Sequence, residues 1–206
     1  MENATKKGKL FVISGPAGSG KGTIMNILTK RSDEYVLSVS LTSRPMLKGE
    51  AEGVNYYYVT REEFEDRIKS GDVLEYTEYC GNYYGTPKAP AINAIESGKN
   101  LLLEIEVDGA MQIKKAFPEA ILVMILPPNV NVQRERLVSR GRDSDESIQK
   151  RLARTREELK FADGYDYVFL NEDGRADEVA DNFEYVAHDE KDRVHDSHNV
   201  VKSYFD

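Results

Sequence analysis

The sequence predicts an α/β fold in which a mostly parallel sheet is flanked by helices. Two observations support this prediction: apolar strand patterns alternate with helical patterns along most of the 206 residues, and one apolar strand ends in a glycine-rich loop that opens a helix. Apolar residues make up 40% of the chain, which is enough to bury a substantial core. A stretch from about residue 40 to 86 is rich in Tyr, Gly, Thr and charge instead, and it predicts a small α+β insertion.

The first predicted strand and the loop after it form a phosphate-binding P-loop. An apolar run that ends at Ile13 leads into Gly15-Pro-Ala-Gly-Ser-Gly-Lys-Gly-Thr23 and then into a helical pattern. Glycines let backbone N–H groups converge on phosphate oxygens, the helix N-terminus adds partial positive charge, and Lys21 can reach the β- and γ-phosphates of a nucleotide. The predicted nucleotide-binding residues of this loop are Gly15, Pro16, Ala17, Gly18, Ser19, Gly20, Lys21, Gly22 and Thr23.

The same loop departs from the strict P-loop pattern at one position. Gly22 stands where a hydroxyl residue that binds Mg²⁺ is expected, and Thr23 comes one residue later. A glycine-rich turn without a ligand is the alternative interpretation, and the lysine at position 21 argues against it.

The remaining elements follow from the spacing of apolar residues and from Gly and Pro breaks. Helices are predicted at about 21–31, 61–70 and 87–97, and another follows residue 109. Further along, a pair of charged helices is interrupted at 139–144, and a last helix lies at the C-terminal end. Strands are predicted at 35–39, 56–59, 74–79, 101–103, 121–126 and 167–170. Together they make one domain of residues 1–206, with a core of about 1–39, 87–128 and 163–206, an insertion of about 40–86 and a charged helical segment of about 129–162.

Charge and composition argue against nucleic-acid and membrane partners. The net charge is −8, and residues 171–206 hold 11 acidic against 4 basic residues, so the acidity is concentrated at this end and no basic face is evident. The sequence contains no run of about 18 apolar residues and no apolar segment near Met1, so nothing in it suggests a membrane-spanning helix or a secretion signal. The single Cys80 favours a reducing, cytoplasmic setting and is expected to be a packing residue, and the acidic end is expected to be a solvated helix face.

Six further motifs follow the P-loop along the chain. They are Thr42-Ser-Arg44 with Gly49-Glu50 and Gly53-Val-Asn-Tyr56, then Glu75, Gly81-Asn-Tyr-Tyr-Gly-Thr86, Leu103-Glu-Ile-Glu106, Arg140-Gly141 with Ile148-Gln-Lys-Arg-Leu152, and Tyr167 with Asn171. Their order and approximate spacing resemble guanylate kinases over residues 9 to about 185. The resemblance implies a P-loop NTPase core, a GMP-binding insertion and a mobile helical lid, which catalyse ATP + GMP → ADP + GDP with Mg²⁺.

Guanine chemistry favours the same insertion residues as the resemblance. Guanine presents N1–H and N2–H₂ donors and an O6 acceptor, so a selective pocket needs an acceptor carboxylate and a donor hydroxyl. Glu75 and Thr86 supply these types, and the alternative for Glu75 is an exposed strand carboxylate. The resemblance adds Ser40 and Glu106 as base-contacting residues, and it implies that the GMP phosphate is held by Arg44, Tyr56 and Tyr84.

Phosphoryl transfer mainly requires positioning and neutralisation of negative charge. Lys21 meets this need on the ATP side, and the resemblance implies a catalytic set of Lys21, Arg44, Arg140 and Arg151, the last two from the lid. Glu104, at the end of an apolar strand, is predicted to orient Mg²⁺-bound water, and Asn171 matches a loop on the adenine side of ATP. The other arginines of the helical pair are expected to be solvated: Arg134, Arg136, Arg142 and Arg154.

The stretch after Arg44 departs from the guanylate kinase pattern. Guanylate kinases usually carry a second phosphate-binding arginine three residues after the first, and Leu47 occupies that position here. The separation from Arg44 to Gly49-Glu50 is unchanged, so no gap restores the match. Either the enzyme binds GMP correspondingly more weakly, or the neighbouring Lys48 supplies the missing charge from a shifted loop, as a point charge without the bidentate fork of arginine. We expect the second, because a cation is retained one residue away.

Two alternatives stay beside the guanylate kinase interpretation. A P-loop kinase for a different phosphorylated acceptor would use the same core, and a non-catalytic guanylate kinase-like interaction domain would tolerate loss of the P-loop. Glu75 within the insertion argues for GMP, with dGMP as a second acceptor, and the intact Lys21 argues for catalysis. The predicted partners are ATP and GMP, and the chain is expected to be a monomer or a homodimer.

Overall fold

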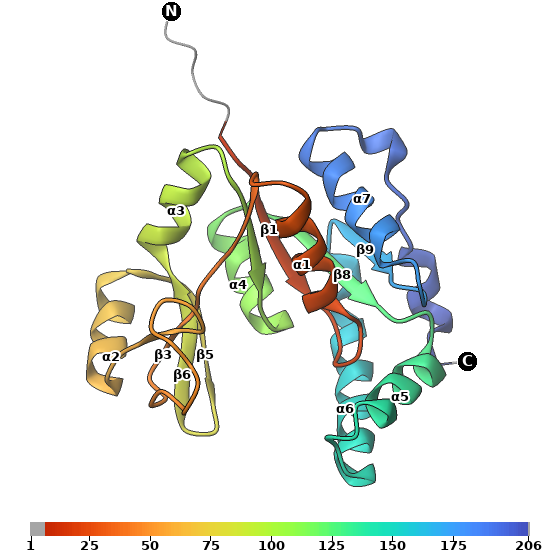
Figure 1. Cartoon of the computed structure of the whole chain (residues 1–206), viewed down its shortest axis with the longest axis horizontal. Coiled ribbons are helices and arrows are strands. Elements are labelled where there is room, and N and C mark those ends of the chain that lie inside the picture. Colours follow the sequence, from red (N-terminus) through yellow and green to blue (C-terminus); the bar gives the residue numbers. More distant parts are fainter. Residues whose placement is uncertain (1–6, 206) are drawn as a thin grey trace, which may run out of the picture.

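The computed structural model describes residues 7–205, and these form a core sheet of five strands that are all parallel (Figure 1). In the order β2-β7-β1-β8-β9, the strands are Tyr35–Leu37, Asn100–Glu104, Leu10–Ser14, Ile121–Leu126 and Tyr167–Leu170. The prediction of an α/β fold with a mostly parallel sheet is confirmed.

The central strands are buried on both faces, which explains their uninterrupted apolar runs. Every residue of β1 is buried, and so are the residues of β8 after Ile121. Helices α1 and α7 cover one face and α3 and α4 cover the other, with bounds Lys21–Arg31, Ala176–Ala187, Lys88–Glu96 and Val107–Ala116. Within residues 7–205, none of the helices is long and apolar enough to span a bilayer.

The carboxyl edge of this sheet is where a ligand site is expected. The chain leaves β1 through α1 on one face, and it leaves β7 through α4 on the opposite face, so the connections on the two sides of β1 diverge. In open α/β sheets, ligands bind outside the carboxyl ends of the strands at such a point. The P-loop follows β1 at this edge, Glu104 ends β7, and Asn171 follows β9.

A second sheet lies beside the core. Its strands, in the order β4-β3-β6-β5, are Tyr57–Tyr58, Leu41–Thr42, Asn82–Pro87 and Val73–Tyr79. Helix α2 (Arg61–Ser70) has the bounds predicted from the sequence and starts at a capping box, in which Thr60 and Glu63 accept each other's backbone N–H groups. Phe64 of α2 is fully buried, and its ring stacks on Tyr83 of β6. These contacts give the segment a small core of its own.

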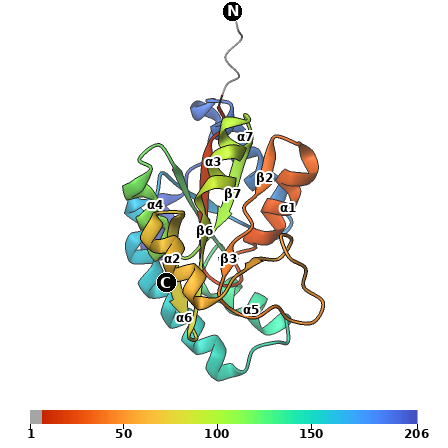
Figure 2. The same ribbon diagram turned by 90° about the vertical axis from the view of Figure 1, so that its left-hand side faces the viewer.

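A pair of helices projects from the carboxyl edge of the core sheet (Figure 1). They are α5 (Val130–Ser139) and α6 (Asp145–Glu158), and a 3₁₀ helix (Leu159–Gly164) follows them. In Figure 1 the second sheet and the α5–α6 pair lie on opposite sides of the ends of β1 and β7, and Figure 2 shows both extending from the same end of the core. The side chains of Asn129 and Ser144 cap the two helices, which explains where each helix begins.

Cys80 is not a packing residue, so that prediction is wrong. The residue is exposed and lies in the turn between β5 and β6, where Cys80 has φ 50° and Gly81 has φ 76°. Two-residue hairpin loops of the type I′ class need positive φ at both central positions. The geometry of the hairpin therefore places this thiol in solvent.

The acidic end of the chain is only partly a solvated helix face. On α7, Asp177 and Asp181 each form an ion pair of 2.7 Å with Arg31 of α1. Beyond α7, the chain returns over the core through two short 3₁₀ helices, and Tyr204 near its end is fully buried. The sequence pattern of charges did not predict this packing, because it depends on partners far away in the chain.

Candidate active site

The P-loop connects β1 to the first turn of α1. Its glycines are required by close packing: a Cβ on Gly15 would lie 2.1 Å from the carbonyl oxygen of Ile125, and one on Gly20 would lie 2.3 Å from Nδ2 of Asn171. Gly20 is the N-cap of α1 at φ 86°, so no side chain caps the helix, and the first turn contains no acidic residue. The N–H groups and the partial positive charge of this helix end suit a phosphate.

Lys21 extends across the loop toward Glu104 at the end of β7. Its Nζ donates to the carbonyl oxygen of Gly15 at 2.7 Å and lies 3.8 Å from Glu104 Oε1. Burial lowers the pKa of the Lys21 ammonium, while the carboxylates of Glu104 and Glu106 counteract this effect. The arrangement puts a cation beside a half-exposed carboxylate at the mouth of the P-loop.

Asn171 and Arg136 hold the P-loop in place. The buried side chain of Asn171 donates from Nδ2 to the carbonyl oxygen of Ser19 at 2.7 Å. Arg136 of α5 donates from Nη1 to the carbonyl oxygen of Gly18 at 3.3 Å and from Nη2 to that of Asn171 at 2.7 Å. The expectation that Arg136 is solvated is therefore wrong, because its guanidinium binds backbone carbonyls at the site.

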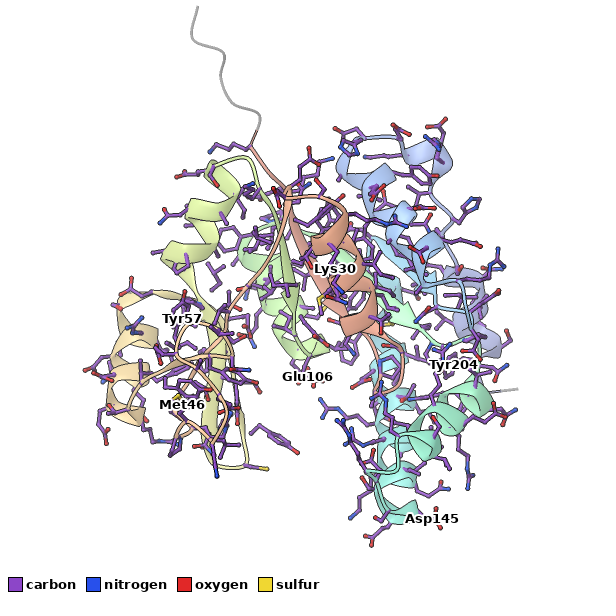
Figure 3. All side chains as sticks on the ribbon, viewed as in Figure 1. Lys30, Met46, Tyr57, Glu106, Asp145 and Tyr204 are labelled. Atoms are coloured by element: carbon purple, nitrogen blue, oxygen red, sulfur yellow. The ribbon has the colours of Figure 1, made fainter. Side chains whose placement is uncertain are left out.

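Three adjoining cavities lie between the core, the second sheet and α6. Their volumes are about 380, 130 and 430 Å³, and Glu106 lines all three. Figure 3 shows Glu106 between Tyr57 of the second sheet and Asp145 at the start of α6. The predicted site residues that line at least one cavity are Gly15, Ala17, Lys21, Ser40, Tyr56, Glu75, Tyr84, Glu104, Glu106 and Arg151. Those outside the linings are Pro16, Gly18, Ser19, Gly20, Gly22, Thr23, Arg44, Lys48, Thr86, Arg140 and Asn171.

Glu75 is the buried acid of the site. It is 4% exposed, lines the cavity of about 130 Å³, and accepts at Oε1 from Thr86 Oγ1 on the neighbouring strand at 2.7 Å. Burial raises the pKa of the Glu75 carboxyl, and hydrogen bonds from the hydroxyl and N–H of Thr86 counteract this effect. A Cβ on Gly109 would lie 2.8 Å from Glu75 Oε2, so α4 approaches the carboxylate closely. The alternative of an exposed strand carboxylate does not hold.

Arg44 is oriented by an acidic partner and by aromatic rings. Its Nη2 donates to Glu50 Oε1 at 2.8 Å and its Nη1 donates to Glu50 Oε2 at 3.1 Å, which makes a bidentate pair. The guanidinium lies 5.4 Å from the ring centre of Tyr56, and the Tyr56 ring meets the Tyr84 ring at 5.9 Å. The bonds from Arg44 and from the Leu47 N–H lower the pKa of Glu50 to about 2.

Leu47 and Lys48 lie in an exposed turn that Glu50 closes. The N–H of Leu47 donates to Glu50 Oε2 at 2.8 Å, and Gly49 adopts φ 94° between them. Leu47 is 59% exposed, so no core contact requires a leucine at this position. Lys48 is also exposed, on the same turn as the oriented Arg44 pair.

The two predicted lid arginines occupy different positions in the helical pair. Arg151 of α6 lines the cavity of about 430 Å³ together with Lys21, and its Nε donates to Asp143 Oδ1 at 3.1 Å. Arg140 follows the last residue of α5, is exposed and lies outside the cavity linings. The structure therefore brings Arg151 to the P-loop cavity and leaves Arg140 beside it.

Several residues at the site were not predicted from the sequence. Asn55 lines the cavity of about 380 Å³, and Glu50 orients Arg44; both stand within a motif that the sequence analysis used, so the motif could have indicated them. Arg154, expected to be solvated, donates to Glu106 Oε2 at 2.5 Å and to Glu158 Oε1 at 2.9 Å. No local pattern predicts the contact with Glu106, because it joins residues 48 positions apart.

The geometry defines a class of protein. A P-loop at the carboxyl edge of a parallel sheet, with a buried carboxylate on a second sheet across the cavity and an arginine-bearing helical pair, is the arrangement of a nucleoside monophosphate kinase.

Comparisons with known proteins give the family within that class. The family model described as guanylate kinase matches residues 7–187. A guanylate kinase of Clostridioides difficile (strain 630) is 42% identical over 200 residues, which cover 97% of each chain. One of Synechocystis sp. is 48% identical over 172 residues, which cover 84% of this chain and 90% of the relative. The crystal structure of guanylate kinase from Anaplasma phagocytophilum matches with a TM-score of 0.68 at 32% identity, over 90% of this chain and 87% of that chain. This chain belongs to the guanylate kinase family and is an enzyme.

Proposed function

We propose that this enzyme transfers the γ-phosphoryl group of ATP to GMP, and also to dGMP, in the reaction ATP + GMP → ADP + GDP. The observation that carries the proposal is the pair of Glu75 and Thr86, both buried on the second sheet beside a cavity that adjoins the P-loop cavity. Within residues 7–205, the hydrogen-bond partner found for the Glu75 side chain is Thr86. A buried carboxylate is costly unless donors surround it, so this site suits a ligand that brings donors.

Guanine fits this requirement better than adenine. The N1–H and N2–H₂ groups of guanine can donate to the Glu75 carboxylate, which Thr86 Oγ1 holds by donating to Oε1. Because the one proton of the Thr86 hydroxyl is used in that bond, O6 would accept from another donor at the cavity, such as the Ser40 hydroxyl. Adenine presents an unprotonated N1 on the same edge, which would face the carboxylate without a proton. Ser40 and Glu106 line the same cavity and are proposed as further contacts to the base.

The phosphate groups are proposed to meet between the two halves of the site. Arg44 is held in a defined orientation by Glu50, and with Tyr56 and Tyr84 it would bind the phosphate of GMP. The P-loop and Lys21 would bind the phosphates of ATP. Arg151 lines the P-loop cavity, and Arg140 is proposed to move toward it when the helical pair closes as a lid.

Mg²⁺ fits the residues at the mouth of the P-loop. The half-exposed Glu104 carboxylate lies 3.8 Å from Lys21 Nζ, and carboxylate and water oxygens are the ligands that Mg²⁺ prefers. Gly22 offers no hydroxyl, so Glu104 would hold the ion through water, and the nucleotide phosphates would complete its coordination. When bound, the ion neutralises charge on the β- and γ-phosphates. Lys21 neutralises charge on the transferring group, and Arg44 orients the acceptor phosphate.

The proposed partners are free nucleotides, and the proposed location is the cytoplasm. The exposed Cys80 has no second cysteine in the chain with which to form an internal disulfide, which suits a reducing compartment. We propose a monomer or a homodimer as the working form.

A coupled assay of ADP formation with GMP, dGMP, AMP, UMP and CMP as acceptors tests the proposed function. We expect turnover with GMP and dGMP and, because unpaired polar groups in the base pocket are costly, a kcat/KM for AMP that is lower by at least about a hundredfold. Preferred turnover of a different acceptor would favour a P-loop kinase of other specificity. Turnover with none of them, in a protein that binds ATP, would favour a non-catalytic interaction domain.

A first prediction concerns the turn after Arg44. We expect Lys48→Ala to raise the KM for GMP by about tenfold or more and to leave the KM for ATP within about twofold, because a charge-assisted contact to phosphate contributes about 1.5–3 kcal/mol. Steady-state kinetics with each substrate varied in turn measures both constants. Lys69→Ala, which removes an exposed cation from α2 on the same insertion, is the matched control. A silent Lys48→Ala, with Leu47→Arg raising kcat/KM for GMP severalfold, would show that the site has lost one phosphate ligand without compensation.

A second prediction concerns closure of the helical pair. Arg136 fastens the last turn of α5 to the P-loop, and the chain beyond it, from Arg140 into the first half of α6, has no such bond to the loop among the residues that the structure describes, so we expect the segment of residues 140–151 to move most. Hydrogen exchange in this segment should slow when non-hydrolysable ATP and GMP analogues bind together. Exchange that stays unchanged with both ligands present would contradict a lid.

A further inference from the structure

The C-terminal segment, residues 194–205, lies beyond the part of the chain that the family model matches, yet it is fastened to the core. The N–H of Ser197 donates to the carbonyl oxygen of Val168 at 2.8 Å, and the N–H of Val168 donates to Asp196 Oδ1 at 2.8 Å. At the other end, the carbonyl oxygen of Tyr204 accepts from the N–H of Val130 at 3.0 Å. The segment therefore runs from the edge of β9 to the first residue of α5, where Figure 3 shows Tyr204.

Tyr204 is connected to the P-loop through one buried amide. The Tyr204 hydroxyl donates to Oε1 of Gln133 on α5 at 3.1 Å, and both residues are fully buried. Nε2 of Gln133 donates to the carbonyl oxygen of Ala17 in the P-loop at 3.0 Å and to Thr155 Oγ1 of α6 at 2.8 Å. Thr155 Oγ1 in turn donates to the carbonyl oxygen of Arg151 at 3.0 Å. One amide thus joins the P-loop, both helices of the pair and the C-terminal segment.

The direction of these hydrogen bonds shows how the Gln133 amide is oriented. The carbonyl oxygen of Ala17 can only accept, so the NH₂ group of Gln133 has to face it. The Tyr204 hydroxyl donates to the carbonyl oxygen at the other end of the same amide, which completes the hydrogen bonds of Gln133 in this orientation and holds the amide in place. A buried polar group that loses a partner is costly, and a connected network of this kind specifies one arrangement.

We propose that Gln133 is a positioning residue for phosphoryl transfer and that Tyr204 of the C-terminal segment orients it. The network sets the place of the P-loop relative to α6, which carries Arg151, and so it sets the geometry on the ATP side of the site. This inference rests on the proposed function, because it assigns these two residues to the same reaction. It adds a segment outside the matched family region to the working site.

Two conservative variants and one matched control test the proposal. Tyr204→Phe removes only the hydroxyl, and Gln133→Met removes all three hydrogen bonds with a side chain of similar size. Tyr35→Phe is the control, because Tyr35 is also buried and its hydroxyl has no hydrogen-bond partner within residues 7–205. The measurements are kcat, the KM for each substrate, the Kd of a non-hydrolysable ATP analogue, and Tm.

We expect Tyr204→Phe to lower kcat by about threefold to tenfold and to weaken binding of the ATP analogue, while the KM for GMP stays within about twofold of the wild-type value. Gln133→Met should cause a larger loss of the same kind, and the double variant should be no worse than Gln133→Met alone, because Tyr204 acts through Gln133. Tyr35→Phe should leave all of these quantities unchanged.

Three outcomes would overturn the proposal. Both variants could lower Tm while kcat and the affinity for the ATP analogue stay at wild-type values, which would show a purely structural role. The double variant could lose the product of the two single losses, or Tyr35→Phe could lose as much as Tyr204→Phe. Wild-type protein that binds the ATP analogue and does not phosphorylate GMP would contradict the proposed function instead, and the affinity comparison, which needs no acceptor, would still decide the role of Gln133.

Discussion

Lys21→Met is expected to lower kcat by about 10²–10³-fold while the fold stays intact, because removing one positioned charge at a developing anion commonly costs this much. The ammonium of Lys21 lies at the mouth of the P-loop, 2.7 Å from the carbonyl oxygen of Gly15 and 3.8 Å from Glu104 Oε1. Methionine keeps an unbranched apolar side chain that is one atom shorter and removes the charge. The loss should therefore appear in turnover and not in stability.

The measurement is steady-state kcat together with circular dichroism and Tm. Lys30→Met is the matched control, since Lys30 lies on the exposed side of the same helix (Figure 3) and the change removes an equal charge. A Lys21→Met protein with native circular dichroism that keeps more than about a tenth of wild-type kcat would show that this loop does not serve phosphoryl transfer.

Glu75→Gln is expected to weaken the binding of GMP by about 1–3 kcal/mol, or roughly 5- to 150-fold, and to change the binding of AMP far less. The glutamine can still accept from Thr86 Oγ1, but its NH₂ group would then face the N1–H and N2–H₂ donors of guanine. Two donors facing each other in a buried site leave both unpaired. The same argument predicts weaker GMP binding as the pH falls and the Glu75 carboxyl becomes protonated, and burial raises the pKa at which this happens.

Titration of GMP and AMP against the variant and the wild type measures this discrimination. Glu78→Gln, on the same strand but half exposed and paired with Arg61, is the matched control and should leave both affinities unchanged. Equal losses for GMP and AMP in Glu75→Gln would show that Glu75 does not contact the base. The Tm of each variant is measured as well, because a variant that is destabilised would show a lower Tm, whereas a variant that has lost only a contact to the base would not.

Local patterns in the sequence predicted much of the fold. The uninterrupted apolar run of Ile121–Leu126 and the helical pattern of Arg61–Ser70 predicted the observed bounds. Burial of both strand faces, and in the structure a capping box at Thr60, act within a few residues and explain why these local patterns suffice. The P-loop was found by the same kind of local signal, and the family and the enzyme class predicted from the motifs are confirmed.

The sequence by itself therefore determined the parallel α/β core, the P-loop and the family, since each depends on short-range spacing of residues. Only the tertiary structure decided which side chains hold the site together. The bonds from Gln133 to Ala17, from Asn171 to Ser19 and from Tyr204 to Gln133 join residues 116, 152 and 71 positions apart. No periodicity along the chain specifies such partners, because a buried donor finds its acceptor only after the elements that carry them have packed against each other.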